Sequence, residues 1–222
     1  MMQPSFQPEV LYHVYNHANG SENLFCNEGN YGYFLHKYTE YLFPVVTTFA
    51  YCLMPNHFHF LVQVRREGEL LAFYKERFAE KLKTVFEVTT LEAFRTLQEL
   101  KTDAHKVVTK QWADFLNGYT QALNRQQNRK GNLFQSNTKR KEVDNTAYYT
   151  HLVHYIHYNP VHHGFAKTME EWEFSSYQTC LADKPTRLQR EEVLDWFGGK
   201  EEYKKYHQSK PAEHLALEME YQ

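Results

Sequence analysis

The chain has 222 residues, of which 42% are hydrophobic and 16% aromatic, and its formal net charge is −2 at pH 7. This composition supports a packed core and excludes a disordered chain, and the charge excludes a protein that binds nucleic acid through its whole surface. The three cysteines form no Cys-x-x-Cys pair, no signal peptide is evident, and no apolar run reaches the roughly 18–20 residues of a membrane span. We therefore expect a soluble, cytoplasmic protein with no membrane partner.

Hydrophobic periodicity predicts the elements of the first part of the chain. Residues 10–17 and 45–53 are rich in β-branched and aromatic side chains and predict two strands. Between them, apolar residues at helical spacing over 30–43 predict a helix. A tight connection at 54–56 leads into a third strand at 57–64. This order of elements is half of a ferredoxin-like pattern.

The second part of the chain reads mainly as helices with one further strand. The predicted helices cover 68–84, 111–128, 145–159, 190–197 and 201–207, and Pro160 is expected to end the third of them. Residues 133–143 predict the last strand, and the charged stretch 85–110 has no clear placement. The mixture of strands and helices therefore predicts an α+β fold.

Two histidines on the third strand are candidates for metal binding. Residues i and i+2 of a strand point to the same face, so His57 and His59 are expected to project side by side, with Phe58 and Phe60 on the opposite face. Neighbouring imidazoles on a rigid sheet suit a divalent metal. The competing interpretation is a pair of partly buried histidines without a ligand.

Tyr155 and Asn159 lie four residues apart and are expected on one face of the helix before Pro160. A tyrosine that attacks a phosphodiester has to lose a proton with a pKa of about 10, and a metal that polarises the phosphate eases the attack. The amide oxygen of Asn159 is a hard ligand that suits such a metal. The competing interpretation is that Tyr155 packs the helix against the sheet.

The stretch from Asn124 to Lys141 carries six basic residues and no Asp or Glu, a block that could follow a phosphate backbone. A solvated basic surface without a ligand is the alternative. The six candidate DNA-binding residues are Arg125, Arg129, Lys130, Lys139, Arg140 and Lys141.

Five motifs in order resemble the single-tyrosine HUH transposases, and within them the REP-associated tyrosine transposases. The match runs over about residues 8–178. The motifs are Tyr12-His13-Val14, Met54-Pro55-Asn56-His57-Phe58-His59, Arg129-Lys130-Gly131-Asn132-Leu133-Phe134-Gln135, Tyr155-Ile156-His157-Tyr158-Asn159-Pro160-Val161 and Trp172-Glu173-Phe174-Ser175-Ser176-Tyr177.

The resemblance implies a ferredoxin-like antiparallel sheet with packed helices, and a DNA-nicking and DNA-joining enzyme. It assigns His57 and His59 as the metal pair, Tyr155 as the nucleophile that forms a covalent 5′-phosphotyrosine, and Asn159 as a third ligand. The implied cofactor is Mg²⁺ or Mn²⁺, and the implied substrate is single-stranded DNA beside a hairpin. It further implies a monomer that assembles its active site within one chain. The chain's own helical patterns predict a helical insertion at about 69–110 and a helical C-terminal extension at 179–222.

Three features depart from the family's pattern. His17-Ala18-Asn19 stands where members often carry Arg-Gly-Asn, and His162-His163 follows Asn-Pro-Val where an arginine is common. The stretch from Glu69 to Lys110 is longer than in compact members. These departures concern the preferred DNA sequence more than the chemistry. The alternatives are a hairpin-binding protein without catalysis and a metal-dependent hydrolase that forms no covalent intermediate.

Overall fold

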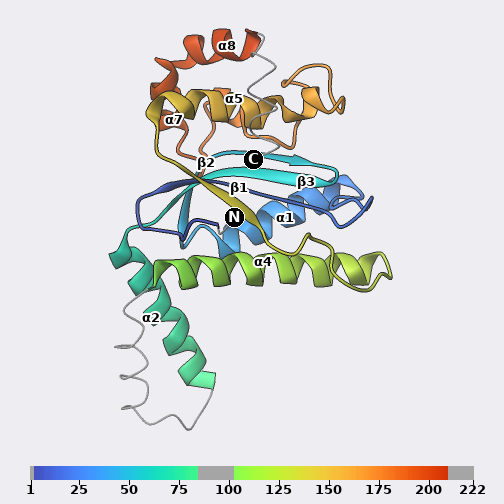
Figure 1. Ribbon diagram of the computed structural model, residues 1–222, viewed down its shortest axis with the longest axis vertical. Helices are drawn as coiled ribbons and strands as arrows, with labels where there is room; N and C mark the ends of the chain where they lie inside the picture. Colours follow the sequence, from blue (N-terminus) through green and yellow to red (C-terminus); the bar gives the residue numbers. More distant parts are fainter. Residues whose placement is uncertain (1–2, 85–102, 210–222) are drawn as a thin grey trace.

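The computed structural model describes residues 3–84 and 103–209, and it confirms the α+β prediction (Figure 1). A four-stranded antiparallel sheet has the order β2-β3-β1-β4, which is the ferredoxin-like order. The strands are β1 (Leu11–His17), β2 (Val46–Met54), β3 (His57–Val64) and β4 (Lys139–Val143).

Helices cover both faces of the sheet (Figure 1). On one face, α1 (Glu28–Tyr41) and α4 (Ala104–Gln126) pack Phe34 and Trp112 against an aromatic core that includes Phe58 and Phe60. On the other face, α5 (Thr146–His162) packs against β2 through a second apolar cluster that contains Leu152. The alternation of β3 therefore sends its phenylalanines to the α4 side and its histidines to the α5 side.

The remaining helices are α2 (Glu67–Thr84), α6 (Tyr177–Leu181), α7 (Arg190–Phe197) and α8 (Lys200–Gln208). Helix α7 contacts both α5 and β2. Helix α8 lies on the side of α5 that faces away from the sheet (Figure 1), and its Tyr203 is fully buried in the second cluster. Within the part of the chain that is described, no helix is both long enough and apolar enough to cross a membrane.

Three predicted boundaries are wrong. The strand expected over 133–143 begins only at Lys139, because Phe134 turns into the core and forms an isolated bridge with Ala18. The helix expected from residue 111 begins at Ala104, where the Asp103 side chain caps it. Pro160 does not end α5, because a proline so close to the C-terminus costs only one backbone hydrogen bond. Residues 85–102 of the unplaced stretch lie outside the described residues.

The segment after α5, over residues 172–176, connects α5 to the sheet through specific contacts. The Trp172 indole donates to the Leu53 carbonyl at 3.0 Å, and the ring of Phe174 stacks on Tyr31 at 3.7 Å between centroids. The backbone of Ser176 donates to the Tyr51 carbonyl at 2.9 Å. These contacts fix the position of α5 over β2 and β3, and so fix where its side chains meet the sheet.

Candidate active site

The α5 face of β3 and β1 carries a cluster of buried imidazoles. His57 and His59 are each 3% exposed and lie with their ring centroids 5.3 Å apart, as the strand period predicts. The neighbouring strand β1 adds His13, whose Nε2 lies 2.9 Å from His59 Nδ1, and His17, whose ring stacks on His57 at 4.5 Å. Two strands thus bring four imidazoles together.

Hydrogen bonds orient both rings of the predicted metal pair. His57 Nδ1 lies 2.7 Å from the Asn56 side-chain oxygen, which can only accept, so Nδ1 carries the proton. His59 Nδ1 shares a hydrogen bond with His13 Nε2, in which one of the two ring nitrogens donates to the other. These contacts leave Nε2 of both rings for a ligand, which is how second-shell partners orient metal-binding histidines.

Burial keeps these imidazoles neutral. It lowers the pKa of His57 to about 2, with smaller contributions from His17 and His163, and it lowers the pKa of His13 to about 3. Burial also depresses the pKa of His59 well below its usual value. A metal ligand must be an unprotonated imidazole, so at neutral pH neither ring has to lose a proton before binding.

Tyr155 projects from α5 onto the same cluster. Its ring centroid lies 5.5 Å from that of His59 and 6.0 Å from that of His13, in edge-on contact with both. The side chain is 7% exposed. The predicted nucleophile and the predicted metal pair are therefore brought together within one chain, although nearly 100 positions separate them in the sequence.

Asn159 lies one turn further along α5 and is 1% exposed. Its Nδ2 donates to the Tyr155 carbonyl at 2.8 Å, which fixes the amide, and its Oδ1 is buried with no hydrogen-bond partner among the described residues. A buried acceptor without a donor is costly unless a ligand supplies the missing interaction. The oxygen is thus of the right type and state for a divalent cation.

The donor set suits a divalent cation in composition. Two neutral imidazoles and one amide oxygen are borderline and hard ligands, and so few protein ligands leave open positions for phosphate oxygens. Among residues 3–84 and 103–209, no group of three His, Cys, Asp or Glu side chains is arranged to hold a metal. The candidate site therefore differs from a closed structural zinc site, which uses four such side chains.

The six basic residues do not form one patch. Lys139 and Lys141 pair in register with Tyr15 and His13, so their side chains share the face of the imidazoles. Arg140 points to the α4 face. Arg129 forms an ion pair with Glu22 at 2.5 Å. Arg125 and Lys130 are exposed near the end of α4.

Sequence reasoning missed the roles of His13, His17 and Asn56. His13 and His17 lie four residues apart on β1, and this even spacing is the signal that could have indicated a shared face. Which strand lies beside β3 depends on the sheet order, so their contact with His57 and His59 could not be read from spacing.

No protein-family model matches the chain, and no curated protein matches it. Its fold is similar to that of a solved REP-associated tyrosine transposase bound to a REP hairpin, with a TM-score of 0.53 and 16% sequence identity. The alignment covers 83% of this chain and 88% of the other. An identity this low shows a shared fold and nothing finer. The resemblance drawn from the motifs is therefore confirmed at the level of the fold.

Proposed function

We propose that the protein is a metal-dependent, single-strand DNA endonuclease and strand transferase that acts beside hairpins through a covalent tyrosine intermediate. The observation that carries the proposal is the buried contact of Tyr155 with His59, next to a second oriented imidazole. A fold shared with a hairpin-bound tyrosine transposase supports the same substrate class. The free thiols of Cys26, Cys52 and Cys180 suit a reducing compartment, and we infer a cytoplasmic protein.

In the proposed reaction, the Tyr155 oxygen attacks the phosphorus of a phosphodiester. A bond forms between the phenol oxygen and phosphorus, the bond from phosphorus to the 3′ oxygen breaks, and a proton passes overall from the phenol to the departing 3′ oxygen. His57, His59 and Asn159 would hold Mg²⁺ or Mn²⁺, which supplies Lewis-acid polarisation of the phosphate and orients it. The phosphotyrosine ester retains the bond energy needed for rejoining, so no nucleotide cofactor is required.

The direct test is detection of a covalent protein–DNA adduct. The protein is incubated with a labelled oligonucleotide that carries a hairpin and single-stranded flanks, with Mn²⁺, and separated on a denaturing gel. We expect a labelled band at the mass of the protein plus the 3′-side fragment. A protein that binds the hairpin without forming the band would be a non-catalytic binder, and cleavage without the band would indicate a hydrolase.

Lys139 and Lys141 are predicted to contact the DNA backbone, since they share the face of Tyr155. Changing both to Gln should weaken binding of single-stranded DNA and reduce the slope of log affinity against log salt by about 1.4, at about 0.7 per lost phosphate contact. Fluorescence anisotropy at several salt concentrations measures both. The control changes Lys37 and Lys75, on α1 and α2, to Gln. Equal slopes for the two double variants would rule out this role.

We also propose that one chain suffices for activity, since Tyr155 contacts His59 of its own chain. A mixture of Tyr155→Phe and His57→Ala proteins, each inactive alone, is then expected to remain inactive. Cleavage recovered on mixing would require sites formed between two chains. Light scattering of the wild-type protein should report the mass of one chain without DNA, and the mass of one chain plus one oligonucleotide with hairpin DNA.

A further inference from the structure

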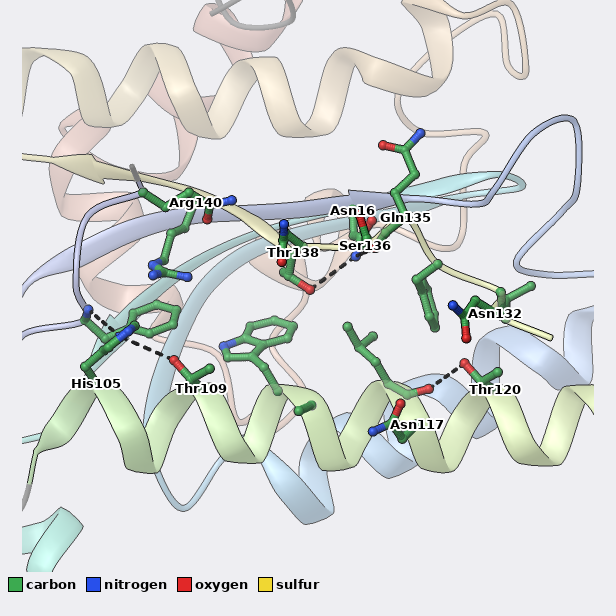
Figure 2. Close-up of a pocket in the computed structure, with 18 residues that line it drawn as sticks. Asn16, His105, Thr109, Asn117, Thr120, Asn132, Gln135, Ser136, Thr138 and Arg140 are labelled. Carbon is green, nitrogen blue, oxygen red and sulfur yellow. Dashed lines mark hydrogen bonds between the residues drawn. The ribbon is translucent and has the colours of Figure 1, made fainter. Parts of the chain in front are cut away.

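A cavity of about 680 Å³ lies on the α4 side of the sheet, the face opposite to Tyr155 (Figure 2). One wall is the side of α4 that carries Trp112, Leu116 and Asn117, and the other is the segment 132–140, which leads into β4. Figure 2 shows side chains from the two walls directed toward the space between them. The labelled polar ones include Thr109, Asn117, Asn132, Thr138 and Arg140.

The lining has the chemistry of a site for a polar, anionic ligand. Amides and hydroxyls supply most of its polar groups, and no carboxylate is among the described residues that line it. Arg140 supplies a positive charge: its Nε donates to the Pro4 carbonyl and its guanidinium stacks on Phe6 at 4.7 Å. The remaining guanidinium nitrogens are suited to bind a phosphate.

Two buried polar atoms of the lining have no partner within the described residues. Trp112 is 3% exposed, and its indole N–H finds no acceptor. Gln3 Oε1 is likewise buried without a donor. Buried polar groups are nearly always satisfied, so an unmet donor and an unmet acceptor in one cavity indicate a ligand that offers both. The edge of a nucleobase offers both.

The cavity is connected to the candidate active site through the end of β1. Its wall is held by Gln135, whose N–H donates to the His17 carbonyl at 2.8 Å, and by Thr138, whose hydroxyl accepts from Asn16 Nδ2 at 3.1 Å. The His17 ring in turn stacks on His57. One short stretch of backbone thus separates the two sites.

The edge strand β4 presents basic side chains to both sites. Its alternation sends Lys139 and Lys141 to the face of Tyr155 and Arg140 to the cavity. Because β4 is the last strand of the sheet order, no further described strand blocks a path around it. A single DNA strand that crosses this edge would find a cation for its phosphates on either side.

We propose that the cavity binds one deoxynucleotide of the DNA strand that Tyr155 cleaves. The base lies against Trp112 and the amides of the lining, and the phosphate lies toward Arg140. That the nucleotide belongs to the cleaved strand rests on the proposed function. Binding in the cavity does not involve Tyr155, so the cavity proposal and the proposed function can fail separately. The cavity is a specificity site on the far side of the sheet from the cleavage site.

The test is an NMR titration of the full chain with each of the four deoxynucleoside 5′-monophosphates. The chain has three tryptophans, so three indole N–H signals are expected, and Trp112→Phe identifies the relevant one. At least one nucleotide should shift the Trp112 signal and leave those of Trp172 and Trp196 in place. No shift with any nucleotide, or the same shift with inorganic phosphate alone, would overturn the assignment of a base-binding site.

A matched pair of variants tests the location. Asn117 and Gln121 are both exposed amides on α4, but only Asn117 lines the cavity. Asn117→Leu should weaken binding of that nucleotide, and of a hairpin oligonucleotide with single-stranded flanks, by about five-fold, the usual effect of one lost hydrogen bond. Gln121→Leu should change neither. Equal effects of the two variants would refute the site, whereas loss of the Tyr155 adduct alone would leave it standing.

Discussion

Tyr155→Phe is expected to abolish the covalent protein–DNA adduct and to lower the rate of cleavage by at least about four orders of magnitude, as removal of a covalent nucleophile does in other enzymes. The change deletes one oxygen and keeps the ring, which lies edge-on to His13 and His59. The fold and the affinity for hairpin DNA should therefore be unchanged. Adduct formation on a denaturing gel, single-turnover cleavage and anisotropy measure the three quantities.

Tyr158→Phe is the matched control for this prediction. It makes the same chemical change three residues further along α5, on a side chain that is partly exposed and stacks on His154 instead of the imidazole pair. Its adduct yield should match that of the wild-type protein. An adduct that persists in Tyr155→Phe and disappears in Tyr158→Phe would show that the nucleophile is Tyr158 and not Tyr155.

His57→Ala and His59→Ala are each expected to abolish metal-dependent cleavage and to weaken Mn²⁺ binding by more than about 100-fold. Loss of an outer-shell partner already costs about 10–100-fold in metal affinity, and these residues are the proposed ligands themselves. Isothermal titration with Mn²⁺ measures binding without reference to activity. Asn159→Ala should have a smaller effect, because it removes one neutral ligand.

Two controls separate metal binding from folding. His36→Ala removes an exposed histidine on α1, outside the imidazole cluster, and should leave both Mn²⁺ affinity and cleavage unchanged. Thermal unfolding of each variant without metal shows whether the fold survives. Cleavage that persists in His57→Ala protein, and also in wild-type protein treated with EDTA, would remove the metal from the proposed mechanism.

The sequence alone determined the type and order of the elements and identified the side chains that could bind a metal or act as a nucleophile. The two-residue period of a strand placed His57 and His59 on the same face of the sheet, because alternate side chains of a strand share a face whatever lies around them. The order of strand, helix and hairpin pointed to a ferredoxin-like sheet, and the ordered motifs pointed to the tyrosine transposases. Such features are local or follow from short connections, so one sequence carries them.

Tertiary structure decided what these residues touch. The sequence predicts a strand from residue 133, but Phe134 is buried in the core and the strand begins only at Lys139. The contact of His13 with His59 depends on β1 lying beside β3, and the contact of Tyr155 with both depends on α5 being fastened by Trp172. The burial of residues that are far apart in the sequence selects among such arrangements. The spacing of residues along the chain does not indicate which distant segment each side chain will contact.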